Sequence, residues 1–247
     1  MIFTSLVLSS LVLLQGNTLD TSRPHRSFRF VYGAAVPEVS PKPAVEVTRA
    51  ATLFTSLVDW PAVFERYGRR RAYSTVKAFH AYVEEIVTRH GGSVVKTTGD
   101  TVMATFPGTG AAVKAGLELQ ARLGDVKRAS ALGRFVAARV GISAGRVLKD
   151  DAGHGPDYFG NTVNAAARLM KRAKPGEVLV GAQAVKDDPD ASALMADAER
   201  TEASLKGFHH PIGVAGLTPP RLRADPANVA RLRQVAGDAI AAVPPRE

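Results

Sequence analysis

The stretch "VVKTTGDTVMATF", residues 94–106, predicts a β-hairpin with a single carboxylate at its turn. Its two apolar runs are typical of short strands, and Thr98-Gly99-Asp100 between them is typical of a tight turn. A lone aspartate in a turn is ordinary, yet sites that bind two metal ions also hold carboxylates in such places, normally in pairs. The hairpin therefore raises the question of where a partner for Asp100 lies.

Upstream of the hairpin the sequence predicts one strand and one long helix. Residues 47–58, "VTRAATLFTSLV", have the β-branched and aromatic content of a buried strand, and Pro61 favours the first turn of a helix directly after it. Apolar residues then recur at helical spacing, which predicts a core-facing helix: Tyr73, Val76, Phe79, Val83, Ile86 and Val87.

Downstream of the hairpin, helices and strands alternate. A helix is predicted over about 111–123, a buried strand in "FVAARVGISAG" from Phe135, and a helix in "GNTVNAAARLMKRA" from Gly160. A strand follows in "GEVLVG" from Gly176, and a last strand pair surrounds "SLKGFHHPIGVAGL" from Ser204. Hairpins mixed with crossover helices indicate an α+β fold, with helices packed on a mostly antiparallel sheet.

The chain divides into three predicted parts: an apolar segment and linker over 1–45, a main domain over 46–217, and a tail over 218–247 with one helix. Residues 1–14 are apolar but too short to span a bilayer, and they lack the positive residues that open a secretory signal. A strand or hairpin from an upstream module is the preferred interpretation of 1–14, and a membrane-associating segment is the second. A cytoplasmic location is expected.

Composition limits the function classes. The net charge of +9 suits a ligand or partner that carries phosphates, but the basic residues are scattered and no nucleic-acid motif accompanies them, so no nucleic-acid partner is expected. The chain contains no cysteine, which excludes disulfides, iron–sulfur clusters and thiolate metal sites.

Three segments together carry a family resemblance: "HGGSVVKTTGDTVMATF" from His90, "PDYFGNTVNAAARL" from Pro156 and "LKGFHHPIGV" from Leu205. They resemble the catalytic domain of the class III nucleotidyl cyclases over about 52–217, and the N-T-V-N-x-A-x-R core is the most specific part. The resemblance implies a ferredoxin-like, palm-type fold. It also implies a head-to-tail dimer that makes a cyclic nucleotide, in which two aspartates of one subunit hold two divalent ions.

The resemblance assigns the base-reading residues. Lys96 and Asp157 match the pair that selects adenine, which implies ATP as substrate and 3',5'-cyclic AMP with pyrophosphate as products. The chemistry is consistent, because an ammonium can donate to adenine N1 and a carboxylate can accept from the exocyclic amine, whereas guanine reverses both polarities.

The remaining assignments concern the ribose and the phosphates. Asn164 matches the residue that orients the ribose, and Arg168, four residues on and on the same helix face, matches the residue that stabilises charge on the α-phosphate. Lys206 falls where a basic residue approaches the terminal phosphates. Singly, these residues would be ordinary surface or turn residues; their joint spacing favours the functional interpretation, least strongly for Lys206.

Asp100 matches the second of the family's two metal-binding aspartates, and the pattern breaks at the first. The first position is occupied by Ser56, which brings no negative charge, so a site for Mg²⁺ or Mn²⁺ is predicted to be weakened. Asp59, three residues further on, could replace it, but capping of the next helix is the favoured role.

Two hypotheses remain open. In one, the chain is an adenylate cyclase that works as a homodimer with altered metal coordination. In the other, it is a catalytically degenerate cyclase module that binds nucleotide, or that regulates or complements a partner cyclase subunit in a heterodimer.

Overall fold

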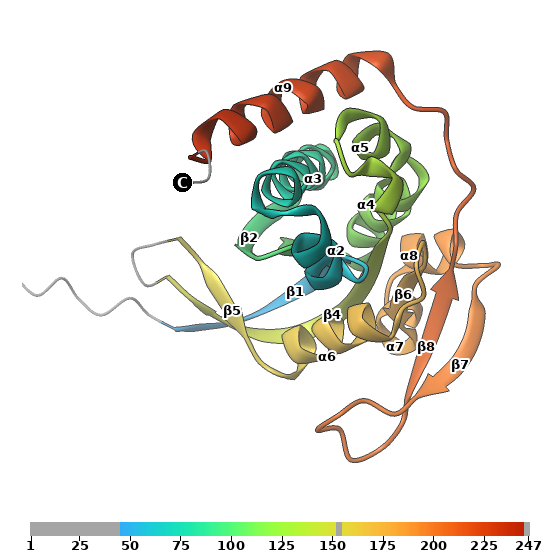
Figure 1. The fold of residues 1–247 in the computed structure, drawn as a ribbon. Helices are drawn as coiled ribbons and strands as arrows, with labels where there is room; N and C mark the ends of the chain where they lie inside the picture. The colour runs from blue at the N-terminus through green and yellow to red at the C-terminus, as the bar shows by residue number, and fades with distance from the viewer. Residues whose placement is uncertain (1–44, 152–154, 245–247) are drawn as a thin grey trace, which may run out of the picture. The chain divides into compact units, whose positions relative to one another are not determined.

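The computed structural model describes residues 45–151 and 155–244 (Figure 1). The segment 1–14 and nearly all of the predicted linker lie outside the described residues, so the prediction made for them stays a prediction. Within the described part, no helix is long and apolar enough to cross a membrane.

One sheet organises the described chain, with the strand order β2-β3-β1-β4-β6-β8-β7 and with β5 paired to β4. Of the described strand pairs, β4 with β6 is parallel and the others are antiparallel. The predicted α+β class and the predicted hairpin are thereby confirmed. The strands are β1 (Glu46–Leu57), β2 (Ser93–Thr98), β3 (Thr101–Phe106), β4 (Ala138–Asp150), β5 (Asp157–Phe159), β6 (Val178–Gly181), β7 (Glu199–Ala203) and β8 (Ile212–Leu217).

Helices cover both faces of this sheet. The described helices are α2 (Trp60–Tyr67), α3 (Arg69–Arg89), α4 (Thr109–Ala121), α5 (Gly124–Ala129), α6 (Asn161–Arg172), α7 (Ala182–Lys186), α8 (Pro189–Leu194) and α9 (Pro226–Ala242), with a 3₁₀ turn at Gly133–Phe135. The helix predicted over about 111–123 is confirmed as α4, and a separate short helix, α5, follows it from Gly124.

The central strand β4 shows how two helices reach opposite faces. Gly116 of α4 lies against Val140 and Ile142 of β4, whereas a Cβ at Gly141 would collide with the backbone of Met170 in α6. Because side chains alternate across a strand, α4 and α6 lie on different faces. Gly141 lets the backbone of α6 approach the sheet directly, and this close approach fixes the helix that carries Asn164 and Arg168.

The main core lies between the sheet and the helices α3 and α4. The α3 residues Phe79, Val83, Ile86 and Val87 are buried as predicted, but Tyr73 is 42% exposed. The prediction for Tyr73 was wrong, because the alternating three- and four-residue spacing of the buried face continues to Ala72, which is fully buried.

The chain after β8 includes α9, which packs on α3 and α5 (Figure 1). Leu232 of α9 is fully buried in the main core. The buried carboxylate of Asp125 accepts hydrogen bonds from the backbone N–H of Asp225 (2.9 Å) and from Nδ2 of Asn228 (2.9 Å). Both apolar and polar contacts therefore hold α9 to the described body.

Candidate active site

The predicted metal-binding positions meet at one end of β1. Ser56 of β1 pairs with Thr101 of β3 on one side and with Arg139 of β4 on the other. Asp100 directly precedes Thr101, in the turn of the hairpin. The fold therefore brings the end of β1 that carries Ser56 to the turn that carries Asp100.

The hydroxyl of Ser56 is turned into the protein. Ser56 is 4% exposed. Its Oγ donates toward the thioether sulfur of Met170 on α6 (3.2 Å) and lies 3.4 Å from the carbonyl oxygen of Leu57. A thioether is a weak acceptor. The place of the missing carboxylate is thus filled by a serine–methionine contact that offers a metal ion no charge.

Asp100 is half-buried, and its surroundings act on it in opposite directions. Burial raises the pKa of the Asp100 carboxyl, while its own N–H, the N–H of Leu57 and the charge of Arg139 each oppose that rise. Arg139 donates from one terminal nitrogen to the carbonyl oxygen of Lys171 (3.2 Å). A guanidinium therefore lies near the carboxylate that the sequence assigns to metal binding.

These donors do not fit a pair of divalent ions. Within the described residues, no group of three or more His, Cys, Asp or Glu side chains is placed to hold a metal. Mg²⁺ and Mn²⁺ favour carboxylate oxygens, and here one carboxylate, Asp100, stands beside a hydroxyl directed at Met170 and near the cation of Arg139. A two-metal site would need a further acidic ligand from elsewhere.

Asp59 does not cap the helix with its side chain. It occupies the N-cap position of α2, but its φ is 52° and its ψ is 27°, and its carboxylate accepts no capping hydrogen bond. The capping prediction was wrong, because a side-chain cap requires an extended backbone at that residue, whereas Asp59 is left-handed. Pro61 supplies the predicted first-turn proline. The rescue role of Asp59 stays a prediction.

The two residues assigned to base recognition are in direct contact. Lys96 of β2 donates from Nζ to both carboxylate oxygens of Asp157, at 2.7 Å each. The ammonium also lies 5.7 Å from the ring centre of Phe159, a distance at which a cation is attracted to an aromatic face. The contact joins β2 to β5, which are separated by 61 positions in sequence.

The charge of Asp157 is stabilised despite partial burial. Burial tends to raise the pKa of its carboxyl, but the hydrogen bond and charge of Lys96, together with the N–H of Tyr158 at 2.8 Å, outweigh it and hold the pKa below its usual value. At neutral pH the side chain of Asp157 is therefore a carboxylate, and both side chains of the pair are partly open to solvent.

Asn164 and Arg168 both lie on α6, with Asn164 exposed and Arg168 partly buried. The guanidinium carbon of Arg168 is 5.5 Å from the ring centre of Phe208, in the loop between β7 and β8. Lys206, in the same loop, is exposed. The fold therefore brings the loop that carries Lys206 next to Arg168.

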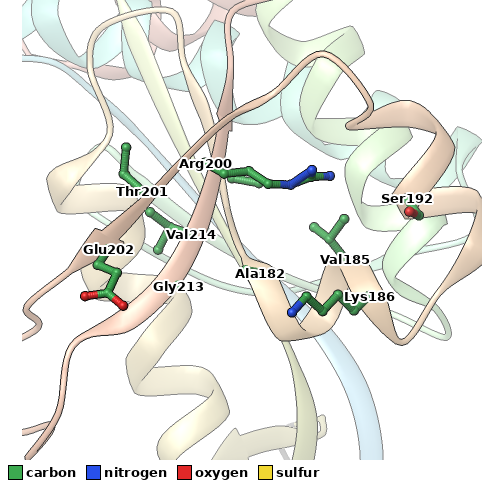
Figure 2. A pocket seen from close by; sticks show the side chains of 10 residues that line it. Ala182, Val185, Lys186, Ser192, Arg200, Thr201, Glu202, Gly213 and Val214 are labelled. Carbon is green, nitrogen blue, oxygen red and sulfur yellow. The ribbon is translucent and has the colours of Figure 1, made fainter.

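A cavity of about 550 Å³ lies elsewhere, between α7, α8, β7 and β8 (Figure 2). Arg200 extends toward Val185 in Figure 2, and the lining of the cavity includes none of the predicted site residues. Of the predicted residues, Asp59, Lys96, Asn164 and Lys206 are exposed, Asp100, Asp157 and Arg168 are partly buried, and Ser56 is buried.

Three residues near these positions were missed by the sequence analysis: Arg139 beside Asp100, Phe159 beside Lys96 and Phe208 beside Arg168. For Arg139 a signal existed, since it is the one charged residue in the run 135–145, "FVAARVGISAG". Nothing in the sequence pattern distinguishes the two phenylalanines from ordinary core residues.

Comparison with known proteins agrees with this geometry. A family model described as the adenylate and guanylate cyclase catalytic domain matches residues 43–212. An uncharacterised protein of Mycobacterium tuberculosis is 33% identical over 159 residues, which cover 64% of this chain and 38% of the relative. An adenylate cyclase of Streptomyces coelicolor is 30% identical over 177 residues, covering 71% of this chain and 42% of that enzyme. The chain thus spans about two fifths of these relatives.

Solved structures show the same fold at low identity. The guanylyl cyclase Cya2 superposes with a TM-score of 0.63 and 17% identity, over 71% of this chain and 94% of that chain. The adenylyl cyclase CyaB of P. aeruginosa superposes with a TM-score of 0.59 and 19% identity, over 72% and 97%.

Proposed function

Because the chain belongs to the family of adenylate and guanylate cyclase catalytic domains, we propose that it supplies one half of a composite site that converts ATP to 3',5'-cyclic AMP and pyrophosphate. This half recognises the base and stabilises the transition state. The metal-binding aspartates come from a second cyclase subunit in a heterodimer. Family membership supports cyclase chemistry, and the local contacts support the division of labour.

The contact between Lys96 and Asp157 carries the proposal. Lys96 Nζ lies 2.7 Å from each carboxylate oxygen of Asp157. On binding, the ammonium donates to adenine N1 and the carboxylate accepts from the exocyclic amine. Guanine presents a donor and an acceptor in the reverse order, so ATP is the expected substrate.

Asn164 and Arg168 act next to the sugar and the phosphates. Asn164 orients the ribose so that its 3'-oxygen faces the α-phosphorus. Arg168 presents a fixed planar cation to the oxygens that gain charge as the 3'-oxygen attacks and pyrophosphate leaves. Lys206 contributes charge at the leaving group.

The second subunit follows from what the metal-binding half lacks. Ser56 directs its hydroxyl to Met170. The family pattern requires two aspartates near this end of β1, at positions 56 and 100, and only Asp100 is present. A partner with both aspartates supplies the divalent ions in this proposal.

An exposed apolar row supports association with such a partner. Val47 pairs with Leu148, and Leu148 pairs with Phe159, so the three side chains lie side by side across β1, β4 and β5. They are 55%, 43% and 47% exposed. Contiguous exposed apolar side chains mark interaction surfaces, and this row ends at the Lys96 contact of Phe159.

Complementation tests the proposal with variants of the chain itself. One variant combines three changes, Ser56→Asp, Asn164→Ala and Arg168→Ala. It adds the metal-binding carboxylate at position 56 and removes the two side chains assigned to the ribose and the α-phosphate. Neither this variant nor the unaltered chain alone should cyclise ATP with Mg²⁺ or Mn²⁺, and their mixture should.

Each contrary outcome would contradict a different part of the proposed function. Activity of the unaltered chain alone that is lost on Asp59→Ala would establish an active homodimer with Asp59 as a ligand. A mixture that prefers GTP would overturn the substrate, and an inactive mixture whose subunits associate in light scattering would overturn the composite site.

A further inference from the structure

The loop of residues 204–211, between β7 and β8, lies against α6 at Arg168. The ring centre of Phe208 is 5.5 Å from the guanidinium carbon of Arg168, within the range of about 6 Å in which a cation is attracted to an aromatic face. The chemistry assigned above gives Phe208 no role.

The backbone of Gly207 also lies close to the guanidinium of Arg168. Its φ of +79° favours glycine, and a Cβ there would lie 3.2 Å and 3.3 Å from the two terminal nitrogens of Arg168. A methyl group at this position would therefore strain the loop and displace the guanidinium. The absence of a side chain leaves room for Arg168 as it stands.

A small core beneath the loop fixes these contacts. Leu169 and Leu205 belong to a second cluster of buried side chains, separate from the main core, and Phe208 packs against it. The N–H of Phe208 also donates to the carbonyl oxygen of Leu205 (3.0 Å). Arg168 directly precedes one of these leucines and Lys206 directly follows the other. One apolar anchor therefore positions both cations that are directed at the phosphates.

From these contacts we propose that Phe208 and Gly207 are positioning residues for Arg168. This inference rests on the proposed function, in which Arg168 stabilises the transition state. An arginine side chain loses rotamer freedom when it is held in one position. The ring of Phe208 and the bare backbone of Gly207 restrict that freedom before the nucleotide binds, so the guanidinium meets the developing charge without rearrangement.

The kinetic test uses a mixture of two versions of the 247-residue chain. One is the triple variant described above, and the other keeps Arg168 and carries the substitution under test. Phe208→Leu keeps an apolar side chain on the small core but removes the aromatic face. It should lower kcat about tenfold, as expected for a misplaced cation, and leave KM for ATP within about twofold. Phe208→Tyr keeps the ring and should restore kcat to within about twofold.

The glycine has a matched control. Gly207→Ala should also lower kcat selectively. Gly91→Ala introduces the same kind of backbone strain, because Gly91 has a φ of +72°, but a Cβ there meets nothing within 4 Å. Gly91→Ala should retain kcat. If Phe208→Leu keeps full kcat, or if both glycine variants lose it equally, the positioning role is overturned.

A measurement without catalysis separates this inference from the proposed function. In the free full-length chain, the ring current of Phe208 should shift the Nε–Hε resonance of Arg168, which is identified by its loss in Arg168→Lys. The resonance should move in Phe208→Leu and stay in Phe208→Tyr. An unmoved resonance in Phe208→Leu overturns the inference, whereas an inactive mixture with the expected resonance shift overturns the proposed function and leaves the positioning contact established.

Discussion

At the end of β1, the two positions that should hold metal ions carry Ser56 and Asp100, and the guanidinium of Arg139 lies near the remaining carboxylate. On β2, β5 and α6, by contrast, Lys96 rests on Phe159 and Arg168 on Phe208, and Lys96 also meets Asp157. The first region holds one carboxylate near a cation, whereas the charged groups of the second region are supported by neighbouring side chains. Under the proposed function, the two halves of one site therefore differ in competence within a single folded domain.

The largest expected effect tests the competent half. Arg168→Ala in the chain that complements the triple variant should lower kcat about 10²–10³-fold, the usual cost of removing one group that stabilises transition-state charge. Steady-state cyclisation of ATP measures it. Arg172→Ala, at the C-terminal end of the same helix, serves as control, because Arg172 is exposed and has no assigned role. Equal losses in both variants would remove the special role of Arg168.

The next effect tests the deficient half. Ser56→Asp adds the missing carboxylate and should tighten Mn²⁺ binding to the free chain by one to two orders of magnitude, since affinity follows the number of charged oxygen ligands. Calorimetric titration with Mn²⁺ measures the change. The side chain introduced by Ser56→Asn has nearly the same shape as that of aspartate but no charge, so this variant should leave the Mn²⁺ affinity low. Similar Mn²⁺ affinity of Ser56→Asp and the unaltered chain would show that the deficiency lies elsewhere.

A smaller effect concerns base choice. Asp157→Asn replaces the oxygen acceptors with an amide that can also donate, so the preference for ATP over GTP should fall about tenfold. Competition binding of the two nucleotides to the free chain measures this ratio. Asp190→Asn controls for general charge, because Asp190 lies on α8 and contacts Lys114. An unchanged ratio in Asp157→Asn would separate this pair from base recognition.

The smallest effect is on stability. Because the pKa of Asp157 is lower in the folded chain than the usual 3.8, the carboxylate contributes stability above pH 3.8, and the contribution is lost as pH falls from there through the folded-state pKa. The pair is solvent-exposed, so Asp157→Asn should cost less than about 1 kcal/mol at pH 7. Urea unfolding at pH 7 and pH 3 should show the difference shrinking on acidification; a difference that grows would contradict the assignment.

Sequence reasoning predicted the hairpin, the order of the main elements and the family, because these depend on local periodicity and on short specific segments; the roles assigned to the site residues stay predictions. It failed where tertiary contacts decide. Asp59 adopts a left-handed backbone that no pattern revealed, and its side chain leaves α2 uncapped. Arg139 approaches Asp100 through strand pairing, and Phe208 approaches Arg168 across 40 positions. Such long-range neighbours become visible once the strand register and the packing of α6 are known.

The contact of Ser56 with Met170 makes these two positions epistatic. An aspartate at position 56 would place a carboxylate against the buried thioether of Met170, which cannot donate a hydrogen bond to it. The longer side chain and α6 would also compete for the same space. A smaller residue at 170 alone would open a gap next to serine. Each single change is therefore unfavourable while the other residue stays as it is, and building a full metal site lowers stability unless positions 56 and 170 change together.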